Sequence, residues 1–161
     1  MNYKMDKPVR YEFLGRKNVD QYIDYLKTAM KLEPDMMTVE SVDESGIRKR
    51  VESPFFMCTP SILALNDDQV IGRIEYHFYG CLQDGQRMAY VDWVYVLPEY
   101  RHIGVGQGLF REFEQQCIRF DIDQYYLIRS VKPEADRFYH SFSDAELSEV
   151  PLLRKYVGSD A

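Results

Sequence analysis

The sequence predicts a single α/β domain built around a mixed β-sheet. The 161 residues are 45% hydrophobic and 29% charged, which is typical of one soluble globular domain with a real core. Apolar residues switch between strand-like and helix-like spacing along the chain. No repeat, low-complexity segment or linker interrupts this pattern, so we expect one domain over residues 1–161.

The first part of the chain predicts one strand followed by two helices. The segment "PVRYEFLG" has the composition of a strand, and residues 18–32 then adopt helical spacing with an apolar stripe. Asn18 is the expected N-cap of this helix, with Gln21 at the capping-box position. A short second helix is expected from about 41 to 52.

Three antiparallel strands are expected next. The segment "SILALNDDQVIGRIEYHFYG" contains two β-rich runs with a turn near residues 66–68, as in a hairpin. A second turn at Asp84 and Gly85 leads into a further strand that ends near Leu97, before Pro98. This strand is the fourth in the chain.

The remainder alternates between helix and strand. The segment "QGLFREFEQQCIRF" has the spacing of a helix with one buried face, and "QYYLIRSV" follows as a strand. Pro133 suits the first position of another helix. The tail "AELSEVPLLRKYV" is expected to form two short strands broken at Pro151. The complete sheet would then have about six to seven strands, flanked by helices.

Charge and composition exclude several classes of protein. A net charge of −6 argues against a nucleic-acid binder, and no apolar run approaches the roughly 20 residues that span a membrane. The N-terminus has no targeting signal, so we expect a cytoplasmic protein. Cys58, Cys81 and Cys117 lack the spacing of a disulfide framework or a metal site, so no metal is expected and each is predicted to pack in the core.

A glycine-rich turn between a predicted strand and helix is the first functional signal. Within "LPEYRHIGVGQGLF", glycines occupy positions 104, 106 and 108, although glycine in a helix costs about 0.5–1 kcal/mol relative to alanine. A helix N-terminus offers unpaired N–H groups that bind anions. Bare backbone here, with donors from Arg101 and His102, predicts a nest for a phosphate or pyrophosphate.

This turn matches neither GxGxxG nor a P-loop, but it resembles the acetyl-coenzyme A motif of the GCN5-related N-acetyltransferases (GNAT family). The motif V-x-P-x-x-[RQ]-x-x-G-x-[GA] is met at Val96, Pro98, Arg101, Gly104 and Gly106. The family's A-x-x-F-Y motif is met about thirty residues later at Ala135, Phe138 and Tyr139. The resemblance covers roughly residues 9–157.

The resemblance implies that acetyl-CoA is the cosubstrate. It implies that the fourth and fifth strands splay apart and that the pantetheine arm pairs with the fourth strand, while main-chain amides of the turn hold the diphosphate. Lys132 stands where the family often has an asparagine that contacts the same arm. The cofactor-binding residues expected on this basis are Val94, Tyr95, Val96, Arg101, His102, Ile103, Gly104, Val105, Gly106, Gln107 and Lys132.

Transfer of an acetyl group to an amine requires a proton acceptor, because an alkylamine with a pKa of about 10.4 is almost fully protonated near pH 7. Asp92 and Glu75 are the candidates, and an exposed strand carboxylate without a catalytic role is the alternative for each. Strand alternation predicts that Tyr90, Asp92, Val94 and Val96 share one face. The resemblance implies that Tyr139 protonates the leaving sulfur; a core tyrosine is the alternative.

We therefore predict an N-acetyltransferase that acts by direct attack of a primary amine in a ternary complex, as a monomer or homodimer. The acceptor region carries several acids, which favours a small cationic amine such as a polyamine or aminoglycoside. A protein N-terminus or lysine is the second choice, and a sensor that binds acyl-CoA without turnover, or a nucleotide-binding protein, are alternatives of other classes. The acids in question are Glu33, Asp35, Glu40, Asp43 and Glu44.

Overall fold

The computed structural model describes residues 5 and 7–157. These residues form two compact units, one through Ile128 and one from Arg129 onward. The first unit contains β1 (Arg10–Phe13), α1 (Val19–Leu32), η1 (Pro34–Met36), α2 (Glu44–Arg50), η2 (Phe56–Cys58), β2 (Ser61–Asn66), β3 (Gln69–Gly80), β4 (Arg87–Val96), η3 (Pro98–Tyr100), α3 (Val105–Arg119) and β5 (Gln124–Leu127). The second contains α4 (Pro133–His140).

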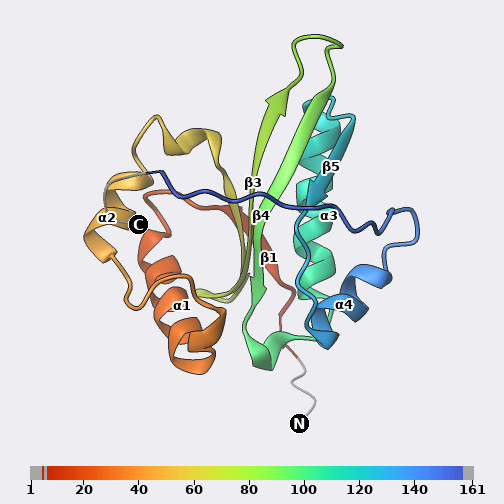
Figure 1. The fold of residues 1–161 in the computed structure, drawn as a ribbon. Helices are drawn as coiled ribbons and strands as arrows, with labels where there is room; N and C mark the ends of the chain where they lie inside the picture. The colour runs from red at the N-terminus through yellow and green to blue at the C-terminus, as the bar shows by residue number, and fades with distance from the viewer. Residues whose placement is uncertain (1–4, 6, 158–161) are drawn as a thin grey trace. The chain divides into compact units, whose positions relative to one another are not determined.

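The sheet of the first unit has the order β1-β2-β3-β4-β5 (Figure 1). The pairs β1/β2, β2/β3 and β3/β4 are antiparallel, and β5 is parallel to β4. A tight turn connects β2 to β3, where Asp67 adopts a left-handed φ of 50°, and a longer loop over residues 81–86 connects β3 to β4. A parallel neighbour requires a crossover, which α3 provides. The predicted mixed, mostly antiparallel sheet is confirmed.

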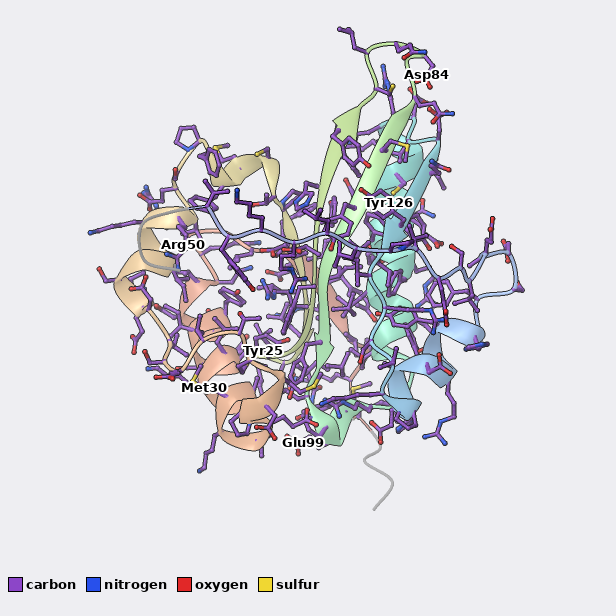
Figure 2. The ribbon with its side chains drawn as sticks, in the orientation of Figure 1. Tyr25, Met30, Arg50, Asp84, Glu99 and Tyr126 are labelled. Atoms are coloured by element: carbon purple, nitrogen blue, oxygen red, sulfur yellow. The ribbon has the colours of Figure 1, made fainter. Side chains whose placement is uncertain are left out.

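Helices cover both faces of this sheet (Figure 1), with α1 and α2 on one face and α3 on the other. Phe113 of α3 packs on Tyr76 of β3, with 4.8 Å between the ring centroids. On the other face, Tyr25 lies between α1 and the sheet (Figure 2), and its buried hydroxyl donates a hydrogen bond to the Tyr95 carbonyl at 2.9 Å. Fully buried aromatic rings therefore fix both layers.

The predicted count of six to seven strands is wrong, because the described residues form five. Residues 145–157 contain no strand, and their side chains are exposed. A short hairpin without a buried face is not stable in water, and Pro151 lacks the N–H that a ladder needs. Strand β5 also ends at Leu127, four residues earlier than the expected run.

Two smaller expectations are also corrected. Asn18 precedes α1 but makes no side-chain cap, because its Oδ1 accepts from the Gly15 amide at 2.9 Å instead. Cys58 and Cys81 are exposed, so only Cys117 packs in the core, where burial raises its pKa to about 11. No group of side chains among the described residues could hold a metal ion, and none of their helices is long and apolar enough to cross a bilayer.

Candidate active site

The glycine turn has the geometry of an anion cradle. Gly104 precedes α3 with a φ of +92°, and α3 has no side-chain cap. The Gly108 amide donates to the Gly104 carbonyl at 2.9 Å, so the amides of residues 105–107 precede the first intrahelical hydrogen bond. An added Cβ at Gly104 would meet nothing within 4 Å. Helix amides without an intrahelical partner, next to a glycine whose Cβ position is unobstructed, fit the diphosphate that the sequence predicts.

Gly108 has a different explanation. A Cβ added there would lie 1.7 Å from the Tyr11 hydroxyl oxygen, so β1 packs tightly on the start of α3. Packing therefore explains this glycine, and the expectation that all three glycines serve a ligand is too broad.

The Arg101 side chain is directed away from the turn's amides, toward the end of α1. Its Nε donates to the Val96 carbonyl at 2.9 Å, and its guanidinium pairs with Glu33. Glu33 also accepts a hydrogen bond from the Tyr95 hydroxyl at 2.7 Å. This cluster ties Arg101, three residues before Gly104, to the C-terminal end of α1.

In the described part of the chain, no strand pairs beyond Val91 with the edge of β4 that faces β5. Strand β5 pairs with β4 only from Met88 to Val91, which agrees with the expected parting of the fourth and fifth strands. The Leu97 amide donates to the Ile71 carbonyl at 2.8 Å, so Tyr95, two residues earlier, directs its backbone toward β3. The backbones of Val94 and Val96 consequently face the open edge.

A β-bulge in β4 brings the two predicted carboxylates together. Trp93 lies opposite Glu75 and Val91 opposite Tyr76, so Asp92 is the extra residue. Its carboxylate interacts with that of Glu75. The predicted strict alternation is wrong beyond the bulge, because directly opposite residues share a face and Trp93, rather than Val94, lies on the Glu75 face.

Glu75 is half-buried in a charged setting. Burial raises its pKa, Arg73 opposes this shift, and the nearby Asp92 adds to it. The Arg73 Nη1 lies 3.3 Å from Glu75 Oε1, and the Ser61 hydroxyl donates to the same oxygen at 3.5 Å. Arg73 itself is only 8% exposed, lies over the Tyr22 ring, and its buried Nε has no partner among the described residues. Sequence reasoning missed Arg73, although its position two residues before Glu75 places both on one strand face.

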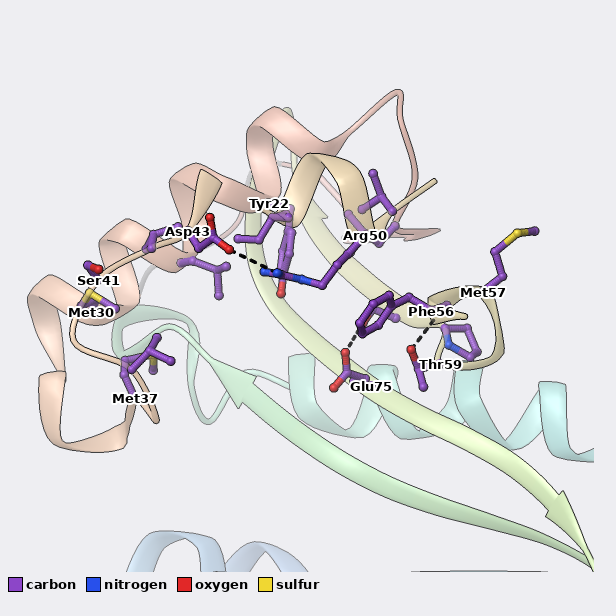
Figure 3. A pocket seen from close by; sticks show the side chains of 18 residues that line it. Tyr22, Met30, Met37, Ser41, Asp43, Arg50, Phe56, Met57, Thr59 and Glu75 are labelled. Atoms are coloured by element: carbon purple, nitrogen blue, oxygen red, sulfur yellow. Dashed lines mark hydrogen bonds and ion pairs between the residues drawn. The ribbon is translucent and has the colours of Figure 1, made fainter. Parts of the chain in front are cut away.

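A cavity of about 510 Å³ opens above Glu75 (Figure 3). Helices α1 and α2 form one side of it, the loop from η1 to α2 another, and η2 with the start of β2 a third. Glu75 reaches it from β3. The cavity lies at the first two helices, where the acceptor region is expected, but its largely apolar lining was not predicted from the sequence.

Most of the acids predicted to attract a cationic acceptor have intramolecular partners. Glu33 pairs with Arg101, Asp43 with Arg50 at 3.2 Å, and Glu44 with Lys27 at 2.6 Å. The Asp43 carboxylate also caps α2 by accepting from the Gly46 amide at 2.9 Å. Asp35 and Glu40 are exposed. The acidic segment is therefore largely structural.

Lys132 and Tyr139 belong to the second unit. Lys132 is the exposed residue that precedes α4, and its amide donates to the Ser130 hydroxyl at 3.3 Å. Tyr139 packs on Phe138 and Phe142, with ring centroids 5.4 and 6.3 Å away, and burial raises its pKa. A raised pKa keeps this phenol protonated, as an acid requires.

Comparison with known proteins supports these observations. The sequence model of the acetyltransferase (GNAT) family matches residues 14–143, a stretch that includes both the glycine turn and Tyr139. A search of curated proteins finds no significant match.

Solved structures share the fold at low sequence identity. An aminoglycoside acetyltransferase, meta-AAC0020, from an uncultured soil metagenomic sample superposes with a TM-score of 0.79 at 15% identity, covering 96% of this chain and 100% of that one. A ribosomal-protein-alanine N-acetyltransferase from Brucella melitensis biovar Abortus 2308 gives 0.71 at 14% identity, covering 92% and 100%. A protein described as a transcriptional regulator from Bacillus halodurans C-125 gives 0.72 at 16%, with the same coverage.

Proposed function

Because the chain belongs to the GNAT acetyltransferase family, we propose that it transfers the acetyl group of acetyl-CoA to a primary amine by direct attack in a ternary complex. Dependence on acetyl-CoA and acyltransfer are properties of the family. The observation that carries the finer proposal is the Glu75 carboxylate, which lines a cavity and has the Asp92 carboxylate beside it. A base in that position is what an alkylammonium acceptor requires.

Acetyl-CoA would supply the reactive thioester. In the proposal the amides of residues 102–107 hold its diphosphate, the backbones of Val94 and Val96 hold its pantetheine arm, and Lys132 contacts the same arm. The open β4 edge and the uncapped start of α3 support these assignments. Arg101 acts through its pairing with Glu33 and the Val96 carbonyl, which fixes the turn.

Two proton transfers complete the proposed reaction. Glu75, assisted by Asp92, accepts the proton that the alkylammonium must lose before its nitrogen attacks the acetyl carbon, and the second proton of that nitrogen replaces the one that Tyr139 gives up. Tyr139 gives a proton to the sulfur as the carbon–sulfur bond breaks, so the products are an amide and the free thiol. General acid–base catalysis of this kind contributes about 10²–10⁴-fold to the rate.

The proposal also covers the chain's organisation and setting. One domain over residues 1–161 is supported by the family match, which runs across the boundary between the two compact units. A cytoplasmic location fits the three free cysteines. We expect a monomer or homodimer.

The test is thiol release from acetyl-CoA across a panel of amines, together with coenzyme A binding measured by calorimetry. We expect release with at least one amine and its loss in Glu75→Gln, with coenzyme A affinity retained. Tight coenzyme A binding without release for any amine would instead favour a sensor without turnover.

A further inference from the structure

We propose that the acceptor is an amine with a single positive charge on an apolar body, rather than a polycation. This inference rests on the proposed function, because it assigns the cavity above Glu75 to the acceptor. The walls, the charges and the rim of this cavity each favour such an amine.

The walls of the cavity are largely apolar. Leu26 and Met30 line it from α1, Met37 from the following loop, and Ile47 from α2. Phe56 covers it from η2, as Figure 3 shows. A volume of about 510 Å³ lies within the range of sites for small organic ligands. An occupant would therefore bury an aliphatic or aromatic group here and gain the hydrophobic free energy of that burial.

The charges of the cavity suit one ammonium group. Among its lining residues the acids are Asp43 and Glu75. Asp43 is exposed and committed to the Gly46 amide and to Arg50, whereas Glu75 lies deeper, on the sheet, where Arg73 is its cationic neighbour. The Arg50 guanidinium, drawn beside Asp43 in Figure 3, would repel a second cation. A polyamine or aminoglycoside would have to leave its remaining cations without partners in an apolar space.

The apolar surface continues outside the cavity. Phe55, Phe56 and Met57 of the segment around η2 are 76%, 41% and 72% exposed. The last two also line the cavity, so they form an apolar rim at its opening. Large exposed apolar side chains in one place mark binding surfaces more often than chance. This rim would contact a longer apolar group that extends beyond the cavity.

The experiment uses the full chain and a homologous series of n-alkylamines from propylamine to octylamine, with 2-phenylethylamine, spermidine and kanamycin beside it. Thiol release gives kcat/KM, and thermal shift gives binding in the presence of coenzyme A. We expect kcat/KM to rise about fourfold for each added methylene until the cavity is filled. Spermidine and kanamycin should be poorer substrates than the best alkylamine.

A matched pair of variants tests the site. Leu26 and Leu32 both belong to α1, but only Leu26 lines the cavity, whereas Leu32 is 50% exposed. Leu26→Gln should reduce the gain per methylene to below twofold, and Leu32→Gln should leave it unchanged. The double variant Asp35→Asn with Glu40→Gln, which removes two exposed acids outside the cavity, should not affect any acceptor.

The outcomes separate this inference from the proposed function. A flat chain-length series with spermidine or kanamycin as the best substrate would overturn the inference and leave the acetyltransferase activity intact. Loss of activity in the Asp35/Glu40 double variant would also overturn it. If alkylamines bind with the expected dependence on length but release no thiol, the apolar-amine site stands and the proposed activity is wrong.

Discussion

Glu75 is the residue on which the proposed chemistry depends most. Its carboxylate borders the cavity and is held by Arg73 and Ser61, while Asp92 lies beside it. We predict that Glu75→Gln lowers kcat by 10²-fold or more, because the variant keeps the shape but cannot accept a proton. Asp92→Asn should have the smaller effect, since Asp92 is exposed on the bulge. An equal loss in both variants would assign the base to the pair rather than to Glu75.

The pH dependence follows from the environment of Glu75. Burial and Asp92 raise its pKa above 4.5, against the opposing effect of Arg73 and the smaller effect of His77. The base is active only when ionised, so activity should fall as the pH decreases through this raised pKa. We predict an acidic limb of kcat/KM centred above pH 4.5 that moves down in Asp92→Asn, because one of the raising charges is removed. A limb that stays in place would exclude Asp92 as a neighbour of the titrating group.

Individual residues were predictable where a motif or a residue type limited the choice. Glu75, Asp92 and the glycines of the turn could be selected because acids and glycines are unusual in those settings. Arg73 could not, because its role depends on burial beneath Tyr22, which only the packing of α1 establishes. The bulge was equally unpredictable, since one unpaired residue in β4 leaves the composition of the strand unchanged.

At the scale of elements, the junction of η3 and α3 combines a backbone constraint with a binding role. Gly104→Ala should destabilise the fold by about 1–2 kcal/mol, because φ is +92° there. Gly104→Asn should be tolerated better, since asparagine adopts left-handed backbone more readily. Both side chains would occupy the open space before the α3 amides, so both should raise KM for acetyl-CoA at least tenfold. Urea unfolding and steady-state kinetics separate the two effects.

The contact between the end of α1 and the turn before α3 also connects two elements. Glu33 accepts from both Arg101 and Tyr95, and its side chain is 30% exposed. We predict that Glu33→Gln lowers the free energy of unfolding by about 1 kcal/mol and raises KM for acetyl-CoA severalfold, since hydrogen bonds to a charged group are lost. The dependence on alkylamine length should not change. The exposed Glu99, on η3, offers the control variant Glu99→Gln.

Helices and strands could be predicted from the periodicity of apolar residues wherever one of their faces is buried. Helices α1 and α3 and strands β2 to β4 have one or two buried faces, and their sequences carry the corresponding spacing. The prediction for the tail was wrong. Its alternating apolar residues suggested strands, but residues 145–157 are exposed and have no partner strand. An alternating sequence pattern does not show whether the edge of a sheet is available for a strand to pair with.

On the scale of the whole molecule, the order of elements was enough to predict a mixed, mostly antiparallel sheet, although not its number of strands, because connection rules leave few topologies. The cavity above Glu75 was not predictable in the same way. Its lining comes from α1, α2, η2, β2 and β3, and its polarity depends on which side chains those elements turn inward. The acids of this region suggested a site for polycations, but most of them form ion pairs within the chain.

The last prediction concerns Tyr139, which is contributed by the second unit. Tyr139→Phe should lower kcat about a hundredfold and leave the dissociation constant of coenzyme A nearly unchanged, because the hydroxyl serves the departing sulfur and not the bound carrier. Since burial raises the pKa of Tyr139 above 10.0, the phenol should remain protonated, and kcat should show no alkaline decline until the pH exceeds 10. Tyr156→Phe is the matched control, as Tyr156 is 73% exposed in the same unit. Equal kinetics for both variants would reduce Tyr139 to a packing residue beside Phe138 and Phe142, and the sulfur would then have to take its proton from another group.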